Sequence, residues 1–379
     1  MIVKKVLFVL PSLKLGGAER YAVEFCNWLV EDKDFEVSFF IYDNQNHFKG
    51  YLNDEIKIFS ANIELNSFSF IKRIINYYVI VPYRLAKILK KWDINVICSG
   101  YQYYCELQII LSFIFNFNLL HLNKISFIHS DLKKRKRNIG IFRKFLFLFS
   151  DFLRYKFFQK VIYVNENLVS SASFRKPSKE LILSVLLDGQ RIIHLSNDNS
   201  NCQINLSDEK EKYFLCASRF ERIKNLELAI RAFNLIKNEI EDSLYLIGEI
   251  TDKKYFDEIM ILIEKLQLQH KVKYLGKFIN PYPLIKNSKA LIMTSLYEGW
   301  PRLLSEASIL EVPVITVSFK NFPSLFNDYV WLTNDYDEKN IACFMKLSYQ
   351  ELKSKKTLKD YIIQNYDVSI IGPRIKGAL

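Results

Sequence analysis

The stretch from residue 295 to 306 reads Ser-Leu-Tyr-Glu-Gly-Trp-Pro-Arg-Leu-Leu-Ser-Glu, and it places two carboxylates, Glu298 and Glu306, eight positions apart. Pro301 suits the first turn of a helix, because the N–H that proline lacks would have no partner there. We therefore expect Glu298 in the loop before a helix and Glu306 inside that helix. The apolar run at 289–294 predicts a strand that leads into the loop.

The start of this helix favours an anion. We expect the backbone N–H groups of Arg302, Leu303 and Leu304 to point out of the first turn, where the helix macrodipole places about half a positive charge. Open α/β sheets bind ligands at such helix starts, beside the carboxyl ends of strands. Glu298 and Glu306 can equally be solvated carboxylates that favour a helix start, and this stretch alone leaves both interpretations open.

Composition limits the classes of protein. The 379 residues are enough for about two domains of ordinary size. Half of the residues are hydrophobic and 15% are aromatic, which excludes a disordered chain. The six cysteines form no C-x-x-C pair and no zinc spacing, so we expect reduced thiols, no metal site and a cytoplasmic protein. The short apolar start predicts a buried first strand rather than a signal peptide.

Apolar runs alternate with helical patterns in both halves of the chain, which predicts an α/β fold with parallel sheets. The predicted strands of the first half are 6–10, 37–41, 94–98, 125–128 and 161–164. Those of the second half are 213–218, 244–247, 272–275, 291–294 and 312–317. We expect an N-terminal domain at 1–190, a polar linker region at 191–211, a C-terminal domain at 212–357, and a tail at 358–379 that packs back on the N-terminal domain. Residues 107–122 predict a core helix, since they are too polar and too few to span a membrane.

A basic and aromatic segment runs from residue 131 to 160. Its ten basic and two acidic residues give a local net charge of +8, and phenylalanines lie between them. This mixture is typical of a helix on an anionic membrane surface. A domain helix with solvated Lys and Arg is the alternative, and no motif supports nucleic acid. The basic residues are Lys133, Lys134, Arg135, Lys136, Arg137, Arg143, Lys144, Arg154, Lys156 and Lys160.

Gly16 and Gly17 follow the first predicted strand and open the first predicted helix. Glycines at such a turn let a phosphate approach the backbone, and the helix N-terminus attracts it. A purely structural turn is the alternative. The segment is not the G-x-G-x-x-G fingerprint, which argues against a nicotinamide or flavin enzyme.

Other charged residues stand at predicted strand ends. Arg219 and Lys224 flank the turn after the first strand of the second domain, where two cations can neutralise a diphosphate leaving group. His129 follows a first-domain strand and can donate to a sugar or phosphate oxygen. Solvated loop charges and a structural histidine are the alternatives. Asp335-Tyr-Asp337 has the acidic spacing of metal-dependent sugar transferases, but its surroundings do not predict a metal site.

Several motifs together resemble the retaining glycosyltransferases of family 4, two-domain transferases of sugar nucleotides with the GT-B fold. The matching pieces are Gly16-Gly17-Ala18-Glu19-Arg20, Ser218-Arg219-Phe220 with Lys224, Gly248, Gly276, and the segment from Glu298 to Glu306. Their order and spacing cover most of the chain.

The resemblance implies two doubly wound Rossmann-like domains that face each other across a cleft. A nucleotide-diphosphate sugar, UDP-linked, would bind the C-terminal domain and an acceptor the N-terminal domain. Transfer would proceed with retention and without a required metal or other cofactor. By the resemblance, Arg219 and Lys224 would bind the diphosphate together with the helix start at Leu303 and Leu304. Glu306 would bind the ribose, and Glu298 would contact the donor sugar. In the first domain, the Gly17 N–H beside Gly16 would bind a phosphate, and His129 would lie near the reaction centre.

Three positions depart from the family pattern. Glu311 stands where relatives usually have a glycine, and residues 318–323 lack the usual glycine-containing loop. Leu187-Asp188-Gly189 replaces the Asn-Gly segment that typically precedes the linker. These departures leave the shape of the sugar pocket open.

We expect a peripheral enzyme on the inner face of the cytoplasmic membrane. It would extend a glycan or polyprenyl-linked acceptor in bacterial lipopolysaccharide, O-antigen or capsule synthesis, without a nucleic-acid partner. The alternatives are a nucleotide-sugar epimerase or phosphorylase of similar architecture, or a non-catalytic basic adaptor for membranes or nucleic acid.

Overall fold

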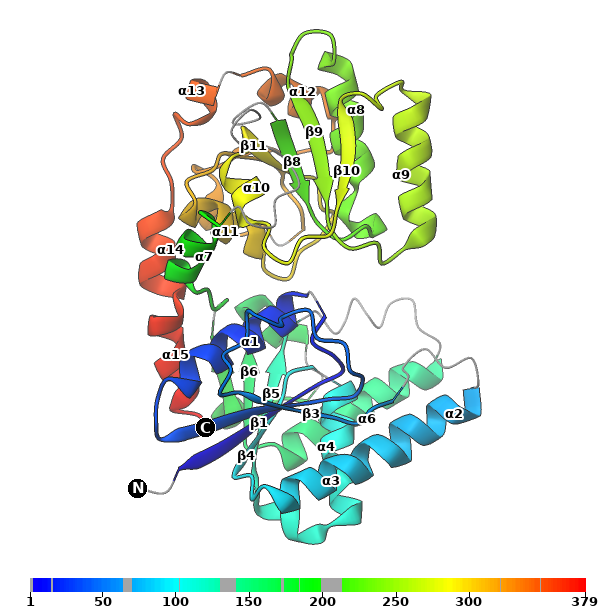
Figure 1. Cartoon of the computed structure of the whole chain (residues 1–379), viewed down its shortest axis with the longest axis vertical. Coiled ribbons are helices and arrows are strands. Elements are labelled where there is room, and N and C mark those ends of the chain that lie inside the picture. The colour runs from blue at the N-terminus through cyan, green and yellow to red at the C-terminus, as the bar shows by residue number, and fades with distance from the viewer. Residues whose placement is uncertain are drawn as a thin grey trace. The chain divides into compact units, whose positions relative to one another are not determined.

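The computed structural model describes residues 3–14, 16–63, 70–101, 103–129, 141–171, 174–183, 185–198, 213–320, 322–347 and 349–379. The chain forms two compact units, which Figure 1 shows in the colours of chain order. The first unit comprises Met1–Leu187 and Val368–Leu379, and the second comprises Asp188–Asp367. Each unit is built on one parallel sheet with helices.

The first unit has a seven-stranded sheet in the order β3-β2-β1-β4-β5-β6-β7. Its strands are β1 Lys4–Leu10, β2 Phe35–Ile41, β3 Lys57–Ser60, β4 Val96–Ser99, β5 Asn123–Ile128, β6 Lys160–Tyr163 and β7 Glu180–Ile182. The five strands predicted from apolar runs are confirmed. The edge strands β3 and β7 were not predicted, because they have no fully buried residue and so lack an apolar run.

Helices cover this sheet. They are α1 Gly17–Val30, α2 Phe70–Ile75, the π-helix η1 Asn76–Ile80, α3 Val81–Lys91, α4 Tyr104–Phe115, α6 Ile141–Phe157 and α15 Val368–Lys376, with 3-10 turns η2 Phe117–His121, η3 Glu166–Ser171 and η4 Pro177–Lys179. The predicted core helix at 107–122 corresponds to α4 and η2. Across the described residues, none of the helices combines the length and the apolar character that a membrane crossing needs.

The second unit has a six-stranded sheet in the order β10-β9-β8-β11-β12-β13. Its strands are β8 Tyr213–Ala217, β9 Ser243–Ile247, β10 Val272–Gly276, β11 Ala290–Met293, β12 Val314–Val317 and β13 Trp331–Thr333. Its helices are α7 Gly189–Leu195, η5 Arg222–Lys224, α8 Leu226–Ile236, α9 Lys253–Lys265, α10 Tyr282–Lys286, α11 Arg302–Ile309, η6 Ser324–Phe326, α12 Glu338–Met345, α13 Tyr349–Leu352 and α14 Lys359–Tyr366. The five predicted strands are confirmed, and the short edge strand β13 is an addition.

The chain leaves the first unit at Leu187 and returns to it at Val368, whose N–H donates to the Leu187 carbonyl at 2.6 Å. After the return, α15 packs on α1. An added Cβ on Gly372 of α15 would lie 2.7 Å from the Trp28 ring, so this contact needs a glycine. Most of the predicted linker region lies outside the described residues, and its first residues belong to α7 of the second unit.

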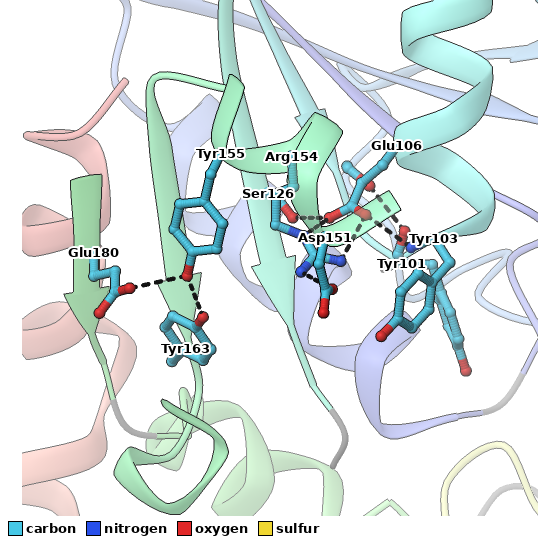
Figure 2. Close-up of polar contacts among 10 residues, drawn as sticks. Tyr101, Tyr103, Glu106, Ser126, Asp151, Arg154, Tyr155, Tyr163 and Glu180 are labelled. Atoms are coloured by element: carbon cyan, nitrogen blue, oxygen red, sulfur yellow. Dashed lines mark hydrogen bonds and ion pairs between the residues drawn. The ribbon is translucent and has the colours of Figure 1, made fainter. Parts of the chain in front are cut away.

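A buried cluster of charges ties α4 to α6 in the first unit (Figure 2). Arg154 is 0% exposed; its Nη2 donates to Glu106 at 2.8 Å, its Nη1 donates to Asp151 at 2.8 Å, and its Nε also pairs with Glu106. The Tyr103 N–H donates to the Glu106 carboxylate at 2.9 Å and fixes the start of α4. The prediction that Arg154 belongs to a basic membrane-facing surface is therefore wrong, because two buried acids hold its charge. Residues 131–140 of that segment lie outside the described residues.

Candidate functional site

The predicted site residues of the second unit lie in loops that follow two neighbouring strands of its sheet. β8 and β11 pair in parallel, so the loops that follow them leave from the same carboxyl edge. Arg219 and Lys224 lie after β8, and Glu298 lies after β11. This is the edge at which parallel α/β sheets bind ligands.

Lys224 and Glu298 form a partly buried ion pair between these two loops. The Lys224 Nζ donates to Oε1 of Glu298 at 2.6 Å, and the two side chains are 16% and 15% exposed. The Ser295 hydroxyl donates to the same oxygen at 2.7 Å. The Thr294 hydroxyl donates to the Lys224 carbonyl at 3.1 Å and joins the two loops a second time. A cation and a carboxylate predicted separately thus meet, and hydroxyl groups hold the Glu298 carboxylate and the Lys224 backbone.

Glu306 is held in a fixed orientation within α11. This helix begins at Arg302, directly after Pro301, so Glu298 in the loop and Glu306 in the helix are confirmed. The carboxylate of Glu306 accepts from Arg302 Nε at 2.8 Å and from the Tyr282 hydroxyl at 3.1 Å. The i,i+4 spacing of Arg302 and Glu306 is visible in the sequence. No sequence pattern points to Tyr282, which arrives from α10.

The start of α11 differs in part from the expectation. The N–H of Arg302 donates to the Trp300 carbonyl at 2.9 Å, and the N–H of Leu304 donates to the Pro301 carbonyl at 2.9 Å. The prediction that all three N–H groups of this turn are free is therefore wrong for these two. Such tight bonds are common where the first turn of a helix has no earlier carbonyl of its own.

Arg219 is half exposed, and its Nη1 lies 3.0 Å from the Glu221 carboxylate. The backbone at this position runs close to the end of β9, because a Cβ on Gly248 would collide with the Ser218 carbonyl. Gly248 also has φ +142, which a residue with a side chain rarely adopts. Gly248 therefore determines the path of the loop that carries Arg219.

The glycine turn of the first unit lies where the sequence predicts it. Gly16 is the N-cap residue of α1, and its carbonyl accepts from the Arg20 N–H at 2.9 Å. The Glu19 carboxylate folds back over Gly16 and occupies the space of a Cβ. At Gly17 the position of a Cβ is open, with no heavy atom within 4 Å.

His129 follows β5 and packs against two aromatic rings. Its imidazole lies edge-on to Tyr21 at 5.2 Å and is stacked with Phe127 at 6.3 Å. Burial lowers the pKa of this imidazole to about 4, so the ring is neutral at pH 7. A neutral imidazole offers one N–H donor and one acceptor nitrogen.

The remaining candidates have local roles. The Asp335 carboxylate accepts from the Asn340 amide at 3.1 Å, and Asp337 accepts from the Lys339 N–H at the start of α12. The described residues contain no group of three His, Cys, Asp or Glu side chains that could hold a metal ion. Of the cysteines that the structure describes, all have free thiols, and Cys343 is the exposed one.

Comparison with known proteins identifies the second unit. Residues 197–364 match the family model of the glycosyl transferases group 1, and this segment contains Arg219, Lys224, Glu298 and Glu306. The second unit is therefore a group 1 glycosyltransferase domain. This confirms the resemblance drawn from the motifs.

Similarity to CapH and to HepE extends over both units. The chain is 25% identical over 333 residues to the capsular polysaccharide biosynthesis glycosyltransferase CapH of Staphylococcus aureus, covering 83% of this chain and 82% of CapH. It is 29% identical over 154 residues to the Campylobacter jejuni N-acetylgalactosamine-N,N'-diacetylbacillosaminyl-diphospho-undecaprenol 4-alpha-N-acetylgalactosaminyltransferase, covering 40% of this chain and 41% of that protein. A crystal structure of Anabaena HepE in complex with UDP and glucose shares the fold, with a TM-score of 0.77, 16% identity, and coverage of 99% of this chain and 98% of HepE. The predicted GT-B fold is confirmed.

Proposed function

We propose that this glycosyltransferase moves a sugar, with retention, from a UDP-linked donor to a glycan or lipid-linked acceptor in bacterial surface polysaccharide synthesis, whether capsule, lipopolysaccharide or O-antigen. The observation that carries the proposal is the Lys224–Glu298 pair at 2.6 Å, in the segment that matches the family model. The HepE structure with UDP supports the donor class. The names of CapH and of the Campylobacter transferase support the acceptor class.

The second unit would bind the donor. Lys224 would hold the diphosphate together with Arg219. The Lys224 ammonium has three N–H donors, and one of them is used in the bond to Oε1 of Glu298. The turn at Leu303 and Leu304 would add the dipole of the helix start. Glu306, oriented by Arg302 and Tyr282, would accept from the ribose hydroxyls. Glu298 would face the donor sugar.

Two cations at the diphosphate would make a metal unnecessary. Departure of the nucleotide builds negative charge on the diphosphate, and preorganised cations stabilise that charge. Arg219 and Lys224 are the two basic side chains that would supply this charge, and both follow β8. We therefore propose activity without a divalent ion, and unchanged turnover in EDTA is the expected result.

The bonding of Glu298 supports direct attack of the acceptor on the donor. A lysine and a serine hydroxyl stabilise the charge on the Glu298 carboxylate, which makes it a weak nucleophile. If the acceptor attacks the anomeric carbon from the same face as that from which the leaving group departs, the anomeric configuration is retained. An inverted product, measured by proton NMR of the anomeric centre, would contradict this mechanism.

The first unit would bind the acceptor and complete the site. The open space at Gly17 suits the approach of a phosphate to the backbone beside Gly16. The neutral imidazole of His129 would donate to an oxygen of the sugar near the reaction centre. A peripheral position on the inner face of the cytoplasmic membrane would bring a polyprenyl-linked acceptor to this unit.

Transfer assays test the donor site. Nucleotide sugars are first screened for slow hydrolysis, and the best donor is then combined with lipid-linked acceptors. Glu306→Ala and Lys224→Ala should each lower transfer at least about 10²-fold while the thermal transition is kept. Lys253→Ala is the matched control, because it removes a lysine from an exposed pair with Asp257 in the same unit. Turnover at the wild-type level in either site variant would overturn the assignment.

A further inference from the structure

The helices from Phe70 to Lys91 form one continuous run in the first unit. Ile75 and Ile80, where α2 meets η1 and η1 meets α3, both have helical dihedrals (φ −59°, ψ −48° and φ −67°, ψ −50°). Figure 1 shows α2 and α3 as one long rod along this unit. The rod is therefore a single surface feature.

One end of this rod is anchored in the core and the other is not. Val81, Leu85 and Leu89 of α3 repeat every four residues and are buried against Ile109 and Phe113 of α4. By contrast, α2 and η1 contain no buried residue. Tyr77 and Ile80 of η1 still pack against this core as partly buried residues, so the six residues of α2, Phe70–Ile75, are the part of the rod that lies beyond it.

Large apolar side chains cover this projecting end. Phe70 and Ile71 are each 68% exposed. The exposed apolar residues that follow along the rod are Ile74, Ile75, Tyr78, Val79 and Tyr83. The Tyr83 ring contacts Phe115 at the end of α4 with ring centres 5.6 Å apart, and Ile114 and Phe117 continue the exposed apolar area. We call residues 70–91 with 114–117 the α2–α4 surface.

The α2–α4 surface is also strongly basic. Residues 70–92 contain no Asp or Glu. Six basic side chains of the rod are exposed: Lys72, Arg73, Arg84, Lys87, Lys90 and Lys91. Lys87 lies over the Tyr83 ring at 4.6 Å, so charged and apolar groups are interleaved. A contiguous apolar area of this kind, with a rim of one sign of charge, marks a docking site.

We propose that the α2–α4 surface docks this glycosyltransferase on an anionic lipid bilayer. The exposed aliphatic and aromatic side chains enter the boundary between headgroups and acyl chains, and the lysines and arginines contact lipid phosphates. A second copy of the chain fits less well, because two faces that each carry six positive charges repel one another. The docking surface deepens the proposed function and rests on it for the lipid-linked acceptor, and it differs from the basic segment at 131–160.

Vesicle sedimentation with the full chain tests the surface. Wild-type protein should sediment with phosphatidylcholine vesicles that contain 30% phosphatidylglycerol, and not with pure phosphatidylcholine. The variant Phe70→Ser/Ile71→Ser/Val79→Ser should raise the lipid concentration for half-maximal binding at least about tenfold, and Lys87→Gln/Lys90→Gln/Lys91→Gln should do the same. All six changes are at exposed positions, so folding should be kept.

Matched variants of the second unit control for loss of apolar area and charge. Met260→Ser/Ile261→Ser/Ile279→Ser and Lys254→Gln/Lys265→Gln/Lys273→Gln also lie at exposed positions, and they should leave vesicle binding unchanged. A further variant tests the basic segment at 131–160 independently of the α2–α4 surface. It neutralises Lys133, Lys134, Arg135, Lys136 and Arg137. If that variant loses binding while the two α2–α4 variants keep it, the proposal is overturned.

Donor turnover separates this proposal from the proposed function. The α2–α4 variants should hydrolyse the nucleotide sugar at the wild-type rate, because they leave the second unit unchanged. Vesicle binding without any donor turnover would refute the transferase and keep the docking surface. Donor turnover with no vesicle binding would refute the docking surface. A dimeric wild-type protein whose Phe70→Ser/Ile71→Ser/Val79→Ser variant is monomeric would refute it as well.

Discussion

The two units share one architecture but use charge in opposite ways. In the first unit, Arg154 and its partners Glu106 and Asp151 are at most 1% exposed. In the second unit, Lys224 and Glu298 remain about one-sixth exposed at the carboxyl edge of the sheet. The first set of charges is closed to water, whereas the second set stays partly accessible. The exposure of an ion pair thus separates a purely structural cluster from one that a ligand can reach.

The units also differ in where apolar side chains lie. The second unit buries most of its large apolar residues, such as Phe214, Phe233 and Leu246, and its exposed ones are spread along the chain. The first unit exposes a continuous group of them on the α2–α4 surface. Stability alone does not account for such a group, since exposed apolar area contributes nothing to the core.

The variant Arg154→Met should destabilise the first unit most. It leaves two buried carboxylates without their cation, which costs about 3–5 kcal/mol in similar cases. Urea unfolding followed by circular dichroism measures the effect, and Lys253→Met, which breaks an exposed pair, is the control. The triple variant Glu106→Gln/Asp151→Asn/Arg154→Met should recover part of the loss. A loss below about 1 kcal/mol for Arg154→Met would show that the buried cluster is no more structural than an exposed pair.

Acid should weaken the first unit through His129. Its pKa is about 4 in the folded chain and about 6.5 when unfolded, so the unfolded state binds more protons between these values. Stability therefore falls as the pH drops through this window, by about 2 kcal/mol between pH 7.5 and pH 5. His129→Phe keeps a ring packed against Tyr21 and Phe127 and should remove this part of the pH dependence. If the free energy of unfolding changes equally with pH in wild type and variant, the pH dependence comes from other titrating groups.

The smallest expected effect lies in the second unit and is a gain. Glu311 follows the C-cap of α11 and lies in the left-handed region, with φ +57, at the position where the family pattern has a glycine. Glu311→Gly should raise the free energy of unfolding by about 0.5–1 kcal/mol, since glycine adopts this conformation without strain. The Glu311–Lys359 pair at 2.9 Å is half exposed and contributes little. Glu311→Ala removes the same pair and keeps the strain, so it should be about 1 kcal/mol less stable than Glu311→Gly.

The fold was largely predictable because buried parallel strands are continuous apolar runs. Nine of the ten strands predicted in this way are interior strands, such as β1 and β8, whose residues are mostly buried, and the tenth is the edge strand β10. The other three edge strands, β3, β7 and β13, were missed, because each is only three or four residues long and a strand paired on one side has less apolar surface to bury. The buried charge of Arg154 was also missed, since its partner Glu106 is 48 positions away.

By itself, the sequence determined the parallel α/β class, the loop position of Glu298, the helical position of Glu306, and the family. These follow from local patterns: apolar runs, the break at Pro301, and motif spacing. Only the tertiary structure decided which charges meet. Lys224 reaches Glu298 because β8 and β11 are neighbours in the sheet although 74 residues separate the two side chains, and Tyr282 reaches Glu306 from α10. The structure likewise decided that Arg154 is buried and that Phe70 and Ile71 are exposed, because burial depends on which elements pack together and no local pattern records that.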